Sequence, residues 1–233
     1  MKKHPFTSAV IVAAGNATRM GLDTPKQLLM INGKTVIEHT LSAFESCALI
    51  DEIIVVTREQ DIEEIKHVCQ SFEKLKAIVP GGKERSDSVK NGISAADSKA
   101  EFYAIHDGAR MLITEEEILS VLQTAYTEKA ATLGTPVTDT VKMVDGMTIL
   151  STPDRSALYA VQTPQVFEKE LYLRALKNAE DKRLKVTDDC SMAEALGEKV
   201  TIALGEYTNI KLTTKTDLLF AQAILKDREK DTI

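Results

Sequence analysis

Two basic side chains flank a run of small residues near the start of the chain. Residues 10–21 have the sequence Val-Ile-Val-Ala-Ala-Gly-Asn-Ala-Thr-Arg-Met-Gly, and Pro25-Lys26-Gln27 follows a few positions later. Small side chains let backbone N–H groups approach an anion closely, and Arg19 and Lys26 add positive charge to the same loop. This combination predicts a phosphate-binding loop and favours a nucleoside triphosphate as its ligand.

The spacing within this loop excludes two common phosphate-binding motifs. The chain lacks the G-x-x-x-x-G-K-[ST] pattern of a P-loop, and Ala17 stands where a G-x-G-x-x-G dinucleotide motif needs a second glycine after Gly15. On these residues alone, a tight strand-to-loop turn with two solvated basic side chains is an equal alternative. The rest of the chain has to separate the two interpretations.

A glycine pair follows another predicted strand. Gly81-Gly82 comes after the run 75–80 and leads into a helix that carries Ser88 and Val89. Free backbone N–H groups at such a helix start can bind a nucleobase edge or an anion. A glycine turn with Ser86 as the helix cap is the structural alternative.

Asp107 and Arg110 place a carboxylate and a guanidinium after the strand 102–107. Mg²⁺ takes one or two carboxylates together with phosphate oxygens, so Asp107 is the best candidate for a magnesium ligand. The alternative is an Asp–Arg pair that closes its own loop. We expect His106 to anchor the loop through hydrogen bonds, because attack by an ionised phosphate needs no strong base.

Two further polar residues follow the last elements of the chain. Thr187 precedes Asp188-Asp189 at a predicted helix start, where its hydroxyl would either face a phosphate or cap the helix. Lys211 lies between Ile210 and Leu212, which alternate inward and leave Lys211 pointing to a site or to water. Taken alone, the alternation favours a Lys211 side chain that points into water.

Strands and helices alternate along the sequence and predict an α/β fold, a mostly parallel sheet with helices on both faces. Ligands of such sheets bind outside the carboxyl ends of the strands, where the polar residues above are placed. The predicted strands are 9–14, 52–57, 75–80, 102–107, 131–137, 160–167 and 200–204, and a capping box at 114–117 predicts the start of one helix.

One segment, at about 138–158, interrupts this alternation. Strand-forming residues 139–144 and 147–150 flank Asp145-Gly146, which predicts a β-hairpin with a two-residue turn. The hairpin is either a lid over the site or an arm that grips another subunit. The arm is favoured, because an isolated two-stranded ribbon is marginally stable.

Composition indicates one soluble domain over residues 1–233. The chain is 43% hydrophobic and 27% charged, and its net charge of −6 argues against a nucleic-acid partner. Cys47, Cys69 and Cys190 are widely separated, which predicts neither disulfides nor a zinc site. The apolar run 9–14 is too short to span a membrane, so we expect a cytoplasmic protein with no membrane partner.

In their order along the chain, these motifs resemble those of the 2-C-methyl-D-erythritol 4-phosphate cytidylyltransferase family. The matching segments are Ala13-Ala14-Gly15, Arg19-Met20, Pro25-Lys26-Gln27, Gly81-Gly82, Glu84-Arg85, Asp87-Ser88-Val89, His106-Asp107, Ala109-Arg110, Pro136-Val137, Asp139-Thr140, Asp154-Arg155, Gln162-Thr163-Pro164-Gln165, Phe167, Thr187-Asp188 and Asn209-Ile210-Lys211. The resemblance implies a Rossmann-like enzyme that joins CTP to a methylerythritol phosphate and releases pyrophosphate, in the non-mevalonate route to isoprenoids.

The same resemblance implies roles for individual residues and a Mg²⁺ cofactor. Arg19, Lys26 and Lys211 would stabilise the triphosphate and its transition state, and Ala13, Ala14, Gly15, Gly82 and Ser88 would bind the cytidine. Asp107, Arg110, Thr140, Arg155 and Thr187 would bind the polyol phosphate. The hairpin would form a homodimer and carry Thr140 and Arg155 into the neighbouring site.

Two positions depart from the family pattern. Ala17 stands where the family usually has a glycine, and Met111 where a proline usually follows the arginine. The first change adds a Cβ beside the phosphates, and the second frees the backbone after Arg110. Two alternatives remain open, a ribitol 5-phosphate cytidylyltransferase and a non-catalytic nucleotide-binding subunit. The retained charged residues count against the second.

Overall fold

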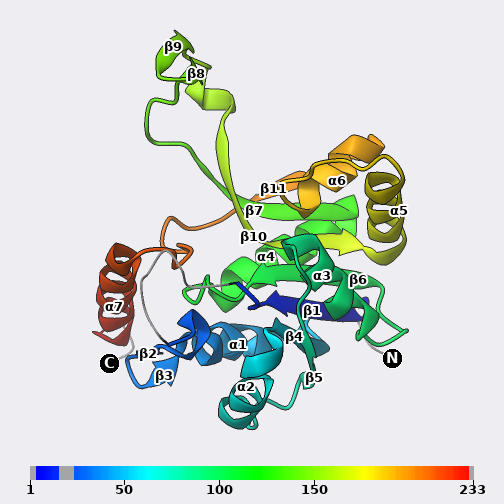
Figure 1. The fold of residues 1–233 in the computed structure, drawn as a ribbon, viewed down its shortest axis with the longest axis vertical. Helices are drawn as coiled ribbons and strands as arrows, with labels where there is room; N and C mark the ends of the chain where they lie inside the picture. Colours follow the sequence, from blue (N-terminus) through cyan, green and yellow to red (C-terminus); the bar gives the residue numbers. More distant parts are fainter. Residues whose placement is uncertain (1–3, 16–23, 231–233) are drawn as a thin grey trace.

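A seven-stranded sheet runs through the centre of the molecule (Figure 1). The computed structural model describes residues 4–15 and 24–230, and its strands follow the spatial order β11-β7-β10-β6-β1-β4-β5. Strand β10 is antiparallel to both of its neighbours, and the other pairs are parallel. The strands are β1 (Thr7–Val12), β4 (Glu52–Thr57), β5 (Leu75–Pro80), β6 (Phe102–Asp107), β7 (Ala130–Pro136), β10 (Tyr159–Glu168) and β11 (Thr201–Leu204).

Helices cover both faces of this sheet (Figure 1). Helices α1, α2 and α4 pack on one face, and α3, α5 and α6 pack on the other. The predicted α/β fold is therefore confirmed. The helices are α1 (Val36–Ser46), α2 (Ile62–Val68), α3 (Arg85–Ser94), α4 (Glu115–Glu128), α5 (Lys169–Asp181), α6 (Asp189–Leu196) and α7 (Lys215–Lys230), with short 3₁₀ turns η2 (Lys26–Leu28), η3 (Glu59–Asp61) and η4 (Arg155–Ala157).

The alternation of side chains along the central strands divides the core into two layers. On β1, Ala9 and Ile11 belong to the cluster under α1 and α4, whereas Val10 belongs to the cluster under α3 and α5. Successive strand residues point to opposite faces, so a strand covered on both faces needs apolar residues at every position. This explains the continuous apolar runs of the sequence.

The hairpin projects from the body of the molecule (Figure 1). Its strands are β8 (Met143–Asp145) and β9 (Thr148–Ser151), and a smaller ribbon, β2 (Met30–Ile31) with β3 (Lys34–Thr35), lies before α1. Asp145 pairs with Thr148, so the two turn residues are Gly146-Met147 rather than the predicted Asp145-Gly146. Gly146 supplies the one positive φ of this turn, +54°.

The predicted strands are all present. Two of the predicted helix caps, however, differ from the structure. The capping box of Thr114 and Glu117 is confirmed. In α6 the N-cap is Asp188, whose carboxylate accepts from the Ser191 N–H, and not Thr187. In α3 it is Glu84 and not Ser86. In each case a neighbouring carboxylate residue is the N-cap in place of the hydroxyl residue, one position later in α6 and two positions earlier in α3.

Within the described ranges, no helix has both the length and the apolar composition needed to cross a bilayer.

Gly92 brings α3 close to the sheet. A Cβ at this position would overlap the Cγ atoms of Val10 and Val56. Both valines are fully buried on the central strands β1 and β4, where neither side chain has space to move aside. The first turn of α3 carries site residues, so this packing contributes to their placement.

Replacing Gly92 with alanine should lower the free energy of unfolding by about 1–3 kcal/mol, because overpacking a dense core costs about that much. Denaturant-induced unfolding would measure the change. Ser94→Ala, an exposed position on the same helix, is the matched control and should stay within about 0.5 kcal/mol of the parent. A Gly92→Ala protein as stable as the parent would contradict the tight approach of α3.

Candidate active site

A cavity of about 350 Å³ opens at the carboxyl ends of β1, β5 and β6. It collects seven of the residues predicted to form the site, from five separate segments of the chain. They are Ala14, Gly15, Lys26, Gly82, Ser88, Asp107 and Lys211, and the remaining lining residues are Val12, Gln27, Lys83, Glu84, Arg85 and Ala109. The sheet therefore brings the small-residue loop, the glycine pair and the predicted cations to one place.

A second cavity, of about 290 Å³, adjoins the first. It contains the predicted residues Arg110 and Thr187, together with Val161, Gln162, Thr163, Gln165 and Asp188. Arg85, Asp107 and Lys211 line both cavities. Two ligands placed in these cavities would meet at these three charged residues.

Close packing requires both glycines, Gly81 against Ala14 of the first loop and Gly82 against Asp87 of α3. A Cβ on Gly81 would lie 2.5 Å from Ala14 Cβ and 2.9 Å from Ser88 Oγ. The Gly82 N–H donates to Ser88 Oγ (3.1 Å), and this hydroxyl donates to Glu84 O (3.1 Å). Ser88 thus holds the turn at Gly82, one wall of the larger cavity.

Lys211 points into the site, although its side chain is still 42% exposed. Its Nζ donates to Asp107 Oδ2 at 2.6 Å. Lys26 Nζ donates to the carbonyl oxygen of the next residue, Leu212, at 2.8 Å. The Lys26–Leu212 bond joins opposite ends of the sequence, and with the Lys211–Asp107 pair it brings both lysines to the larger cavity.

Asp107 is the charged centre of the site. Its Oδ1 accepts from Arg85 Nε (3.2 Å), and its Oδ2 accepts from Lys211. Burial alone would raise the pKa of Asp107, but the positive charges of Arg85 and Lys211 outweigh burial and hold its pKa well below the usual value. The predicted alternative, a loop closed by an Asp107–Arg110 pair, is not the arrangement found.

His106 anchors this strand end, as predicted. Burial, together with the charge of Arg110, lowers the pKa of His106 to about 3 against the opposing charge of Asp107, so the ring is neutral. The Asp107 N–H donates to Thr163 Oγ1, and the Thr163 hydroxyl donates to His106 Nδ1, both at 3.0 Å. His106 Nε2–H then donates to Arg110 O (3.2 Å). This chain of neutral hydrogen bonds fixes the backbone of Asp107.

Arg110 is directed by the segment that precedes Lys211. Its Nη1 donates to the carbonyl oxygen of Asn209 (2.7 Å), and Asn209 is itself fully buried, donating to Gln162 Oε1 and Thr163 O. Met111, at the position that departs from the family pattern, packs in a cluster with Leu212 and Ala221. The apolar side chain thus secures the backbone after Arg110 by burial.

The remaining predicted site residues lie elsewhere. Ala13 is buried in the core, and its N–H donates to Val56 O. Thr140 and Arg155 are exposed on the projecting segment, where Arg155 Nη1 donates to Thr138 O, and neither lines the two cavities above. Arg19 and Ala17 lie outside the described residues.

Sequence reasoning missed the residues that support the charged groups. Arg85 and Thr163 contact Asp107, and Asp189, Tyr172 and Gln165 hold the start of α6. Three of the five, Arg85, Thr163 and Gln165, lie within motifs that carry the family resemblance, but without an assigned role, and Asp189 directly follows the motif Thr187-Asp188. Tyr172 sits on the inner face of α5 with no distinguishing pattern.

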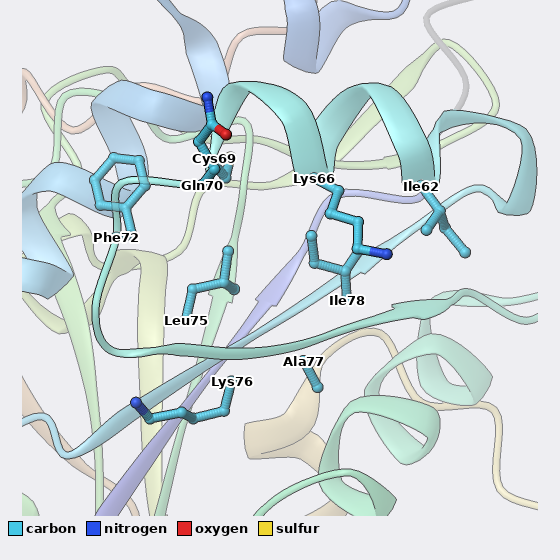
Figure 2. Close-up of a pocket in the computed structure, with 9 residues that line it drawn as sticks. All are labelled: Ile62, Lys66, Cys69, Gln70, Phe72, Leu75, Lys76, Ala77 and Ile78. Atoms are coloured by element: carbon cyan, nitrogen blue, oxygen red, sulfur yellow. The ribbon is translucent and has the colours of Figure 1, made fainter.

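A third cavity, of about 280 Å³, lies between α2 and β5 (Figure 2). Apolar side chains such as Phe72, Leu75 and Ile78 line much of it, with Lys66 and Lys76 as its charged residues. Cys69 also lines this cavity, and burial raises the pKa of its thiol to about 12, so the thiol stays protonated. Among the described residues, no carboxylate or imidazole lines this cavity, and the candidate active site is the first pair of cavities.

The chain was compared with known proteins. The family model for 2-C-methyl-D-erythritol 4-phosphate cytidylyltransferase matches residues 7–227. The enzyme of that name from Caldanaerobacter subterraneus subsp. tengcongensis is 47% identical, with 94% of this chain and 98% of the relative covered. Its counterpart from Halalkalibacterium halodurans is 44% identical, with 96% of this chain and 98% of that relative covered.

Solved structures give the same result. A 4-diphosphocytidyl-2C-methyl-D-erythritol synthase from Anaerococcus prevotii has a TM-score of 0.86 and 35% identity, with 95% of this chain and 96% of that chain covered. The 2-C-methyl-D-erythritol 4-phosphate cytidylyltransferase from Thermus thermophilus has a TM-score of 0.76 and 30% identity, with 95% of this chain and 99% of that chain covered. The chain therefore belongs to the 2-C-methyl-D-erythritol 4-phosphate cytidylyltransferase family.

Proposed function

We propose that the protein transfers the cytidylyl group of CTP to 2-C-methyl-D-erythritol 4-phosphate, forming 4-diphosphocytidyl-2-C-methyl-D-erythritol and pyrophosphate. The observation that carries this proposal is the pair of adjoining cavities that share Arg85, Asp107 and Lys211. CTP occupies the larger cavity, with its base at Gly82 and Ser88 and its phosphates toward Lys26 and Lys211. The acceptor occupies the smaller one, beside Arg110 and Thr187.

The reaction requires little more than positioning and positive charge. An oxygen of the acceptor phosphate attacks the α-phosphorus of CTP in line, and the bond to the departing pyrophosphate breaks. Negative charge accumulates on the phosphate oxygens, where Lys26 and Lys211, joined by Arg19 as the resemblance implies, stabilise it. Because the acceptor phosphate is already ionised, neutral His106 keeps its structural role.

Asp107 fits the magnesium cofactor that we propose. Each of its two oxygens accepts one hydrogen bond, which leaves a lone pair on each for a metal. The described residues contain no group of three or more His, Cys, Asp or Glu side chains that could enclose an ion. Phosphate oxygens and water would complete the coordination, as is typical of Mg²⁺, and the ion would neutralise charge on the triphosphate.

The projecting hairpin supports the further proposal of a homodimer. Val144, Met147, Ile149 and Leu150 are all more than half exposed, and Met147 is 99% exposed. An apolar ribbon of this kind is stable only when it packs against another surface. Docking on a second copy would bury it and bring Thr140 and Arg155 to the neighbouring acceptor cavity.

The methylerythritol acceptor is favoured over ribitol 5-phosphate, since the relatives reported above are all named for the methylerythritol reaction. The two lysines and Asp107, gathered in one cavity, favour catalysis over a non-catalytic binding role.

Purified protein should release pyrophosphate from CTP and Mg²⁺ when 2-C-methyl-D-erythritol 4-phosphate is supplied, because both cavities then hold their substrates. Ribitol 5-phosphate in a parallel reaction, and ATP, GTP and UTP in place of CTP, should give little release. EDTA should stop the reaction and added Mg²⁺ restore it. Faster pyrophosphate release with ribitol 5-phosphate would refute the proposed acceptor. No release with either acceptor would refute the proposed activity.

Lys26→Ala should lower kcat by about 10²–10³-fold, the loss typical of removing one preorganised charge-stabilising group. The same pyrophosphate assay measures it. Lys34→Ala removes an exposed lysine that donates to Ser42 outside the cavity, and this control should keep the parental rate. Near-normal turnover by a folded Lys26→Ala protein would refute the assignment of Lys26.

Light scattering should give twice the chain mass at assay concentration, and Ile149→Asp with Leu150→Asp should shift the protein to monomer. Two buried carboxylates in an apolar interface carry a large desolvation cost. Gln123→Asp, an exposed position on α4, is the control and should leave the mass unchanged. A parental protein that is monomeric throughout would contradict the dimer.

A further inference from the structure

Arg85 connects the two halves of the site. It is the first residue of α3 and lines both substrate cavities. Its Nε donates to Asp107 Oδ1 (3.2 Å), and its Nη1 donates to Asp189 Oδ2 (2.6 Å). Asp107 ends β6, whereas Asp189 begins α6, so one guanidinium joins two elements that are far apart in the sequence.

Asp189 is held by Tyr172, which lines neither substrate cavity, and by Gln165, which lines the smaller one. Its side chain is 2% exposed, and its Oδ1 accepts from Tyr172 Oη at 2.8 Å. Burial, reinforced by the charge of Asp189, raises the pKa of Tyr172 well above its usual value, so the phenol keeps its proton and acts as the donor. The N–H groups of Asp189 and Cys190 donate to Gln165 Oε1.

This arrangement fixes the start of α6 and the two residues before it. Thr187 lines the acceptor cavity and lies two positions ahead of Asp189. The chain of contacts therefore runs from Tyr172 through Asp189 and Arg85 to Asp107. A planar guanidinium can bond two carboxylates at once with fixed geometry, which a single ammonium group does much less well.

We propose that Arg85 is a positioning residue of the transfer reaction, which holds the Asp107 carboxylate on the nucleotide side and, through Asp189, holds Thr187 on the acceptor side. The kinetic part of this inference rests on the proposed function, whereas the structural part rests on the geometry alone. A direct contact between Arg85 and a substrate phosphate is the competing explanation.

Arg85→Lys separates the two explanations. It keeps the positive charge but loses the fork that spans Asp107 and Asp189. Loss of positioning should lower kcat/KM for the acceptor by about 10- to 100-fold, because misplacement by about an ångström has an effect of that size. The KM for CTP should change much less. A direct contact with a phosphate of CTP predicts the reverse. The KM for CTP should then rise, and kcat/KM for the acceptor should fall less because the positive charge is retained.

Tyr172→Phe tests the chain from its far end. The variant keeps the ring, which packs beside Tyr103 and Phe167, and removes the hydroxyl that bonds Asp189. Tyr172 lines neither substrate cavity. Positioning predicts that its kcat/KM for the acceptor also falls, in the same direction as Arg85→Lys and by less. An unchanged kcat/KM for the acceptor in Tyr172→Phe would contradict the proposed chain of contacts.

Arg58→Lys is the matched control. Arg58 makes a two-point ion pair with Asp61, through Nε (2.6 Å) and Nη2 (2.9 Å), and lines neither substrate cavity. The same substitution at this ion pair should leave kcat/KM for both substrates at the parental value. A fall equal to that of Arg85→Lys would mean that the loss reflects general destabilisation, which would overturn the inference.

Amide hydrogen exchange provides a readout that needs no activity. Residues 187–192 should exchange faster in Arg85→Lys and Tyr172→Phe than in the parent and in Arg58→Lys. Unchanged exchange in this segment overturns the positioning role whatever the assay shows. A parent with no transferase activity but with the expected exchange differences would refute the proposed function and leave the structural coupling supported.

Discussion

The Asp107 carboxylate, held between Arg85 and Lys211, is the interaction on which the rest of the site depends. A buried carboxylate is tolerated only when cations and hydrogen bonds compensate its lost hydration. Here the two cations come from α3 and from the segment after β11, so satisfying one charge fixes two elements against the end of β6. The same contacts offset the repulsion between the two cations, which both line the cavity proposed to bind the triphosphate.

The antiparallel strand β10 supports this arrangement from the side. It crosses between β6 and β7 with an irregularity between Val161 and Gln165, and the residues at that irregularity face the site. Thr163 accepts the Asp107 N–H there, and Gln165 binds the start of α6. The backbone ladder is interrupted at this irregularity, and the Thr163 and Gln165 side chains bond to the site there, so the antiparallel strand of the central sheet supports the site.

Much of this structure was predictable from the sequence, for physical reasons that differ between elements. The buried strands were predicted within one or two residues, since continuous apolar runs between turn residues leave few alternatives. Lys26, Gly82 and Asp107 were expected near the carboxyl ends of such strands, and all three line the larger cavity. The caps at Glu84 and Asp188, the turn at Gly146 and the inward direction of Lys211 depend on competition between neighbouring groups or on distant partners. Tyr172 and Asp189 meet only after α5 and α6 have packed, and no local pattern encodes such a meeting.

The bond from Lys26 to the carbonyl oxygen of Leu212 joins residues 186 positions apart. Closing a loop of that length carries an entropic cost, so we expect this contact to form after the more local contacts of the sheet. During synthesis, the residues of β1 to β6 leave the ribosome long before Lys211 does. The small-residue loop, the glycine pair and Asp107 are thus made without the ammonium group of Lys211, and the charged centre can form only after that residue has been added.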